Sequence, residues 1–190
     1  MDMSGEAQRR LILHMSVSLD GFSAAGRDVP GRVNHGSVRH QANLEMIGQV
    51  GLIAIGRGAY EEMAPAWATS DSPMARLINA LPKVVFSTSL AAVDWDNAVL
   101  NAGPVEEEIP RLKAQSAGDI VVFGGARFAH SLIRHRLVDE YRLTVHPIAL
   151  GGGSALMHDL PQPQRFELVS STVYTDGSTV QVLRPAGHDG

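Results

Sequence analysis

The pattern of hydrophobic and polar positions divides the chain into alternating strand-like and helix-like segments. Short runs in which every residue is apolar, such as Leu52–Ile55 and Ile120–Phe123, are typical of strands buried on both faces of a parallel sheet. A stretch at Ala98–Leu100 is a candidate for one more short strand. The main strands are predicted at Leu11–Val17, Gly51–Ile55, Lys83–Phe86, Asp119–Phe123, Leu137–His146, Phe166–Tyr174 and Ser178–Leu183.

Helix-like segments lie between these strands. Helices are predicted over Ser37–Gln49, Ser72–Leu81, Val105–Ala117 and Ala126–Arg136. The dipeptide Ser72-Pro73 is a favourable cap and first-turn pairing. Pro110 must lie in the first turn of its helix or kink it, and a short helix around Glu61–Met63 is expected to end at Pro65.

The order of these segments predicts the fold class. Strand–helix units come first, and the last two strands flank Thr175–Gly177, a hairpin loop built on Asp-Gly. Parallel units followed by an antiparallel end imply an α/β fold, with three α/β/α layers and a mixed, mainly parallel sheet. We expect a single domain over residues 1–190, with an ordered core at about 10–184.

Composition excludes several classes of function. The chain has 190 residues, a formal net charge of −4 and no cysteine, which excludes disulfides, thiolate metal sites and cysteine nucleophiles. The acidic balance argues against nucleic acid as a partner. No apolar run approaches the ~18 residues of a membrane helix, and no signal peptide is visible at Met1–Arg10. We therefore expect a cytoplasmic protein that needs neither a membrane nor a metal.

Candidate chemistry lies where strands end. In an open α/β sheet, ligands bind beyond the carboxyl ends of the strands. Four of those ends carry informative sequences, at Ser18–Gly21, Gly56–Gly58, Ser87–Ser89 and Gly124–Arg127. Two of them are glycine-containing turns that lead into a helix. Such a turn lets a ligand approach the backbone, and the helix N-terminus that follows favours a phosphate.

The side chains of these turns favour the same ligand. Arg57 and Arg127 would add charge-assisted donors, and the hydroxyls of Ser87, Thr88 and Ser89 could donate to a phosphate monoester. Any one glycine turn is also explained by backbone geometry alone. Three turns in successive units favour an extended ligand with several phosphates, although neither a G-x-G-x-x-G nor a G-x-x-x-x-G-K-[ST] motif is present.

Several segments resemble a known superfamily. They are Leu11–Phe22, Ile53–Met63, Val84–Ser89, Val122–Ala126 and Leu137–Gly153. Together they are similar to the dihydrofolate reductase superfamily, and more closely to the branch that contains the RibD C-terminal domain, the reductase domain of riboflavin biosynthesis. The resemblance covers roughly residues 10–184 and is not specific to a substrate.

The resemblance implies a dihydrofolate reductase-like fold and an NADPH-dependent reductase. The substrate would be a small heterocycle such as 5-amino-6-(5-phosphoribosylamino)uracil. Arg57 with Ser87–Ser89 would take the adenosine 2′-phosphate, and Gly124-Gly125, commonly a cis bond in this superfamily, would form the turn under the pyrophosphate. The implied cofactor residues are Gly56, Arg57, Ser87, Thr88, Ser89, Gly124, Gly125, Ala126 and Arg127. A homodimer is expected on the same ground.

The sequence defines the catalytic and substrate-binding residues less clearly than the cofactor-binding residues. In the riboflavin branch Asp20 would face the nicotinamide side and assist hydride transfer, although an aspartate before glycine also serves as a simple turn residue. His35 and His40 are candidates for contacting substrate. Trp67 would either wall the substrate pocket or anchor a loop.

Two other functions stay open. Dihydrofolate reduction is one, but the acidic residue that grips the pterin would fall near His40, and the nearby acid is Glu45. The other is a nucleotide- or pterin-binding module without turnover. No zinc deaminase motif, H-x-E with P-C-x-x-C, accompanies the reductase-like segments.

Overall fold

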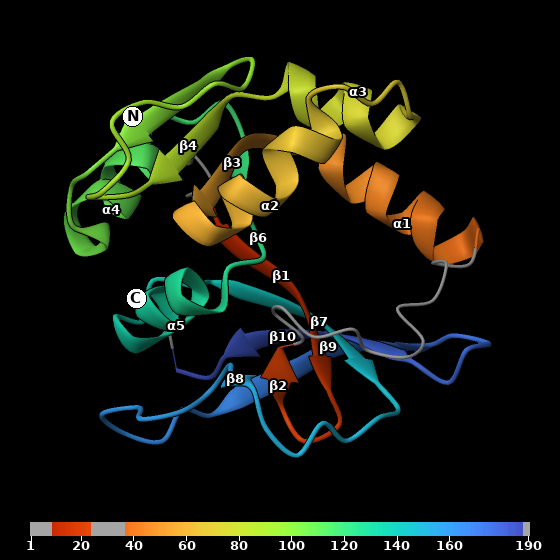
Figure 1. Ribbon diagram of the computed structural model, residues 1–190. Helices are drawn as coiled ribbons and strands as arrows, with labels where there is room; N and C mark the ends of the chain where they lie inside the picture. Colours follow the sequence, from red (N-terminus) through yellow and green to blue (C-terminus); the bar gives the residue numbers. More distant parts are fainter. Residues whose placement is uncertain (1–8, 24–36, 188–190) are drawn as a thin grey trace, which may run out of the picture.

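One eight-stranded sheet forms the centre of the computed structural model, which describes residues 9–23 and 37–187, with the backbone alone for 37–40 (Figure 1). Its strands are β1 (Leu11–Ser18), β3 (Val50–Gly56), β4 (Lys83–Phe86), β5 (Ala98–Asn101), β6 (Asp119–Phe123), β7 (Glu140–His146), β9 (Phe166–Val173) and β10 (Thr179–Pro185). They lie in the order β5-β4-β3-β6-β1-β7-β10-β9. The strands from β5 to β7 are mutually parallel, whereas β10 is antiparallel to both of its neighbours. The predicted mixed, mainly parallel sheet is confirmed.

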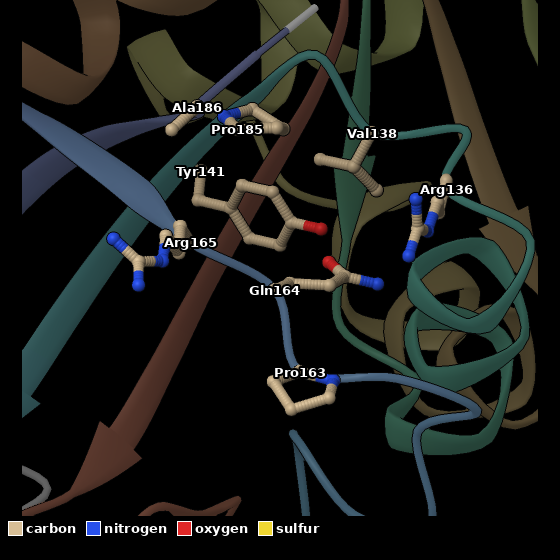
Figure 2. Close-up of a pocket in the computed structure, with 8 residues that line it drawn as sticks. All are labelled: Arg136, Val138, Tyr141, Pro163, Gln164, Arg165, Pro185 and Ala186. Carbon is tan, nitrogen blue, oxygen red and sulfur yellow. The ribbon is translucent and has the colours of Figure 1, made fainter.

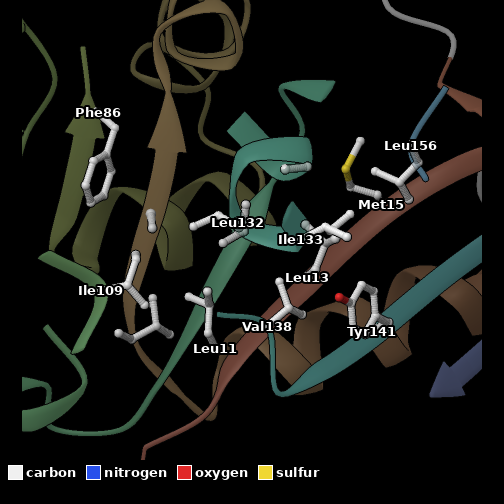
Figure 3. Packing of buried hydrophobic residues seen from close by; sticks show 14 of the residues in the cluster. Leu11, Leu13, Met15, Phe86, Ile109, Leu132, Ile133, Val138, Tyr141 and Leu156 are labelled. Atoms are coloured by element: carbon white, nitrogen blue, oxygen red, sulfur yellow. The ribbon is translucent and has the colours of Figure 1, made fainter. Parts of the chain in front are cut away.

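Helices cover both faces of this sheet. They are α1 (Ser37–Ile47), α2 (Arg57–Trp67), α3 (Pro73–Ala80), α4 (Val105–Gln115) and α5 (Ala126–Arg134). Because side chains alternate along a strand, neighbouring residues of β6 enter different cores. Ile120 belongs to the cluster under α4 and α5 (Figure 3), and Val121 belongs to the cluster under α1, α2 and α3. The predicted three layers are therefore present. No helix in the described ranges is long and apolar enough to cross a membrane.

Proline does not end α2, contrary to the sequence prediction. The helix begins at Arg57 and runs to Trp67 with Pro65 inside it. A proline in the last turn removes only its own donor, and the following Ala68 N–H still bonds to the Ala64 carbonyl at 3.0 Å. Pro110 is likewise accommodated inside α4.

The predicted strand Leu137–His146 is shorter in the structure, where β7 begins only at Glu140. Strand β7 ends at His146, because Pro147 has no N–H for the ladder. The chain beyond it forms a loop instead. Two very short strands form a second sheet, in which β2 (Phe22–Ser23) pairs with β8 (Ser154–Ala155). This second sheet is not predicted from the sequence.

A buried lysine closes the end of α3. Lys83 is 1% exposed, and its ammonium donates to the carbonyls of Ile78 at 2.8 Å, Asn79 at 3.1 Å and Leu81 at 2.7 Å. The last carbonyls of a helix have no partner within the helix. The charge also lies 5.1 Å from the centre of the Trp95 ring. Lys83, the first residue of β4, thus fixes the end of α3 to that strand.

Candidate functional site

The four informative turns lie together at one edge of the sheet, the edge formed by the carboxyl ends of its parallel strands. Strands β4, β3, β6 and β1 are consecutive neighbours and parallel, so their carboxyl ends point the same way. The turns that follow them are Ser87–Ser89, Gly56–Gly58, Gly124–Arg127 and Ser18–Gly21. The structure therefore brings the predicted cofactor residues and Asp20 to a common edge.

The N-termini of two helices lie at this edge, each directly after one of the adjacent strands β3 and β6. Helix α2 begins directly after Gly56, and α5 begins directly after Gly125. Neither helix has a side-chain hydrogen bond at its cap within the described chain, so the first backbone N–H groups are available to an anion. The two helix dipoles add positive potential at the same place.

The glycine turn before α5 differs from expectation in its peptide bond. Among the described residues there is no cis bond, so Gly124-Gly125 is trans and the expected cis bond is wrong. The chain reverses instead through positive φ angles of 59° at Gly124 and 74° at Gly125. Other residues adopt such angles at a cost, which explains glycine at both positions.

Gly56 is required by a close approach. A Cβ atom at this position would lie 2.5 Å from Cβ and 3.0 Å from Cγ of Phe128. Phe128 in turn stacks on Phe86 of β4, with ring centres 5.0 Å apart. The start of α5 is therefore held against the ends of β3 and β4. At Gly58, by contrast, nothing lies within 4 Å of an added Cβ.

An arginine–serine pair lies beside these helix ends. One terminal nitrogen of Arg57 donates to the Ser89 hydroxyl at 2.8 Å, and its Nε lies 3.5 Å from Glu61. The Ser87 hydroxyl accepts from the N–H groups of Ser89 at 3.2 Å and Leu90 at 3.1 Å, which shapes the turn. Arg57 keeps half of its side chain exposed. The predicted grouping of Arg57 with Ser87–Ser89 is thus present as geometry.

Arg127 supplies a second exposed cation. It lies in the first turn of α5, and no side chain in the described part of the protein pairs with it. Uncapped helix ends, open space at Gly58 and two exposed guanidinium groups suit a ligand with several phosphates. The residues present therefore fit a dinucleotide that carries a 2′-phosphate.

Asp20 joins two loops at the same edge. Its Oδ1 accepts from the Ser18 hydroxyl at 2.5 Å and from the Leu150 N–H at 3.0 Å, while Oδ2 accepts from the Gly151 N–H at 2.8 Å. The Ser18 hydroxyl, followed by these backbone donors, lowers the pKa of Asp20 to about 2. The carboxylate is therefore ionised at neutral pH and holds the glycine-rich loop after β7. A contribution of Asp20 to catalysis stays a prediction.

Replacement of Asp20 by asparagine is expected to lower the thermal midpoint at pH 7 but not near pH 2. The folded pKa lies below the value of about 4 in an unfolded chain. The bonds to the carboxylate consequently stabilise the fold above pH 4, and this contribution is lost as the pH falls toward 2. Thermal denaturation of both proteins from pH 7 to pH 2 checks this. A difference between their midpoints that does not change with pH would contradict it.

The predicted substrate residues are not brought together. His35 lies outside the described residues, as does the side chain of His40. Trp67 is the last residue of α2, about 15 Å along the helix from Arg57, and it packs against the cluster under α1, α2 and α3. This contact favours its anchoring role. Glu45 lies on the exposed side of α1 with Gln41, away from the buried Met46 and Ile47.

A pocket of about 260 Å³ lies elsewhere (Figure 2). It opens between the start of β7 and the end of β10, at the opposite edge of the sheet, and includes no predicted site residue. The residues that line it are Arg136, Val138, Tyr141, Pro163, Gln164, Arg165, Pro185 and Ala186. It is separate from the candidate site.

Sequence reasoning missed two contributors to the site. Phe128 packs closely against Gly56, and the backbone N–H groups of Leu150 and Gly151 donate to Asp20. From the sequence alone, Phe128 is only one apolar residue within the helix predicted over Ala126–Arg136. The contacts to Leu150 and Gly151 span about 130 positions in sequence and leave no local signal.

Comparison with known proteins finds a matching family profile and a similar protein of nearly the same length. A family profile described as the RibD C-terminal domain matches residues 9–180. The chain is 29% identical over 182 residues to the uncharacterized protein YyaP of Bacillus subtilis (strain 168), covering 93% of this chain and 94% of that protein.

Two solved structures show the same fold. One is a diaminohydroxyphosphoribosylaminopyrimidine deaminase/5-amino-6-(5-phosphoribosylamino)uracil reductase from Thermotoga maritima, with a TM-score of 0.66 and 16% identity, covering 94% of this chain and 57% of that chain. The other is the dihydrofolate reductase of Enterococcus faecalis complexed with NADP(H), with a TM-score of 0.64 and 12% identity, covering 94% of this chain and 98% of that chain. At such identities the likeness establishes the fold, and the predicted dihydrofolate reductase-like architecture is confirmed.

Proposed function

This chain belongs to the RibD C-terminal domain family, and we propose that it is an NADPH-dependent reductase of a small heterocyclic substrate. One observation carries the proposal: Arg57 and Ser89 are paired beside two uncapped helix N-termini on adjacent strands. That combination supplies a site for a phosphate monoester next to a site for a pyrophosphate.

Each group at the edge has a distinct task in this proposal. NADPH supplies the hydride when it is bound. Arg57 and Ser89 bind its 2′-phosphate, and the first N–H groups of α2 and α5 receive the pyrophosphate. Asp20 is ionised, so its task is to hold the loop at Leu150–Gly151 and to present a fixed negative charge rather than to donate a proton.

The substrate that we propose is 5-amino-6-(5-phosphoribosylamino)uracil, whose ribosylamino group would be reduced to the ribityl chain. Family membership and the fold shared with the Thermotoga reductase support this choice. The present chain spans only 57% of that protein, whose name also includes a deaminase. Dihydrofolate is the second candidate, and it is less favoured because Glu45 lies on the solvent side of α1.

Turnover with both candidate substrates tests the proposal. We expect NADPH to be consumed with the ribosylamino substrate, and mass spectrometry to find a product heavier by two hydrogens. Arg57→Ala should raise the KM for NADPH by roughly ten- to a hundredfold, the equivalent of one charged hydrogen-bonded contact, and change kcat little. NADPH binding without turnover of either substrate would instead indicate the nucleotide-binding module.

A further inference from the structure

The pocket between the start of β7 and the end of β10 contains a buried hydroxyl without a protein partner. Tyr141 is 1% exposed, and its ring packs edge-on against Phe166 with ring centres 5.0 Å apart. Within residues 9–23 and 37–187, no hydrogen bond joins the Tyr141 hydroxyl to another group. A buried phenol normally has such a partner. The hydroxyl is therefore available to a ligand in the pocket that Tyr141 lines.

Two other polar side chains lie on the side to which this hydroxyl points. Figure 2 shows the Tyr141 hydroxyl directed toward Gln164 and Arg136, with Arg165 on the other side of the ring. The Gln164 amide nitrogen donates to the Ile133 carbonyl at 3.2 Å, which leaves its amide oxygen as an acceptor. The pocket thus offers both donors and an acceptor to a ligand.

The Tyr141 hydroxyl acts as a donor at neutral pH. Burial, and to a smaller extent the charge of Asp139, raises the pKa of Tyr141 above its ordinary value, so the hydroxyl stays protonated. Asp139 does not take up this proton in a hydrogen bond. Its carboxylate instead binds the Lys113 ammonium and the Leu11 N–H.

Two arginines without an acidic partner line the same pocket. One terminal nitrogen of Arg136 donates to the neutral amide oxygen of Gln162 at 3.2 Å. Arg165 pairs with no side chain in the part of the chain that the structure describes. None of the described residues that line the pocket is acidic. The positive charge at the pocket is therefore not neutralised and favours an anion.

Arg136 occupies a backbone position that favours glycine. It follows the end of α5, where its N–H bonds to the Ile133 carbonyl and the Leu137 N–H bonds to the Leu132 carbonyl, both at 3.0 Å. This pair of bonds closes many helices, usually with glycine at the position of Arg136. The φ angle of Arg136 is 55°, which a residue with a side chain adopts at a cost. The local backbone therefore does not explain an arginine here.

We propose that this pocket binds a small organic oxyanion, either a carboxylate or a phosphate monoester with a short apolar body. Arg136 and the Tyr141 hydroxyl donate to the anionic oxygens, and charge-assisted bonds of this kind are the strong ones. The amide oxygen of Gln164 accepts from a hydroxyl or amine of the ligand. Arg165 adds positive potential at the rim.

The walls and the size of the pocket suit such a ligand. Val138, Pro163 and Pro185 provide apolar surface for its body. The volume of about 260 Å³ lies just below the ~300–1,000 Å³ of pockets for drug-sized molecules, which indicates a smaller ligand. The pocket lies at the amino end of β7, whereas the candidate cofactor residues follow the carboxyl ends of the strands. The inference is thus independent of the proposed reductase function.

Titration of the isotope-labelled protein with benzoate and phenyl phosphate, followed by NMR, tests the site. Benzamide is the control ligand, because it has the shape of benzoate without the charge. We expect at least one of the two anions to bind with a millimolar or lower dissociation constant, at least about tenfold more tightly than benzamide, and to shift the amide signals of Val138, Gln164 and Ala186. The tighter of the two anions identifies the oxyanion. Binding of neither anion, equal affinity for benzamide, or shifts confined to the turns at Gly56–Gly58 and Gly124–Arg127 would overturn the proposal.

Two substitutions remove the binding groups without a cost to the fold. Tyr141→Phe deletes only the unpartnered hydroxyl, and Arg136→Gly deletes the guanidinium at a position that favours glycine. Each should weaken the tighter anion at least about tenfold, while the thermal midpoint stays the same or rises. Arg134→Ala is the matched control: it removes the same charge from the same end of α5, but outside the pocket, and should change the affinity by less than about twofold. Equal losses in all three variants, or no loss in Tyr141→Phe and Arg136→Gly, would contradict the assignment.

Discussion

Alanine at Gly56 is expected to lower the free energy of unfolding by roughly 2–3 kcal/mol, the usual cost of overpacking. The added Cβ would lie 2.5 Å from Cβ of Phe128, a distance that forces α5 or β3 to shift. Because this shift also moves the glycine turn before α5, the affinity for NADPH should fall at least about tenfold. Urea denaturation and nucleotide titration measure the two effects.

Gly58→Ala is the matched control for this substitution. It lies in the first turn of α2, and nothing is within 4 Å of an added Cβ. The free energy of unfolding should stay the same or rise by up to about 1 kcal/mol, because alanine favours a helix over glycine. Equal destabilisation by Gly56→Ala and Gly58→Ala would show that the contact with Phe128 is not the cause.

Methionine in place of Lys83 is expected to lower the free energy of unfolding by about 3 kcal/mol. The substitution keeps a long side chain but leaves the carbonyls of Ile78, Asn79 and Leu81 without their donor. Removal of a buried charge offsets part of this loss. Chemical denaturation at neutral pH measures the change.

Lys113→Met provides the comparison for Lys83→Met. Lys113 donates to one carbonyl, that of Leu137, at 3.2 Å and pairs with Asp139, whose side chain is 33% exposed. Its loss should cost less, about 1 kcal/mol, because one carbonyl loses its donor where Lys83→Met leaves three without one. If the two substitutions cost the same, the closure of α3 by Lys83 would not be an important source of stability.

The sheet and the candidate site could be predicted from sequence for a common reason. Fully apolar runs such as Ile120–Phe123 indicate buried parallel strands, and parallel strands place their carboxyl ends at one edge. Residues that follow different strands, such as Arg57 and Ser89, are thereby brought together without any knowledge of side-chain contacts. Even the weak segment at Ala98–Leu100 proved to be a strand, since it pairs with β4.

The features that escaped prediction depend on distant contacts. The two-residue strands β2 and β8 are too short to show a periodic pattern. The loop after β7 is set by Pro147 together with Asp20, which lies far away in sequence. A lysine at position 83 is no signal of burial by itself, because lysine is rarely buried without partners, and its partners come from the end of α3.

Titration calorimetry of NADPH and NADH against wild type and Arg57→Ala is the sharpest test of the proposed cofactor site. We expect the wild type to bind NADPH roughly ten- to a hundredfold more tightly than NADH, the contribution of one charged phosphate contact, and Arg57→Ala to lose this preference. Arg76→Ala, which removes an exposed arginine of α3 far from the edge, should retain it. If the wild type bound neither nucleotide, or both with equal affinity, the proposed NADPH site would be wrong.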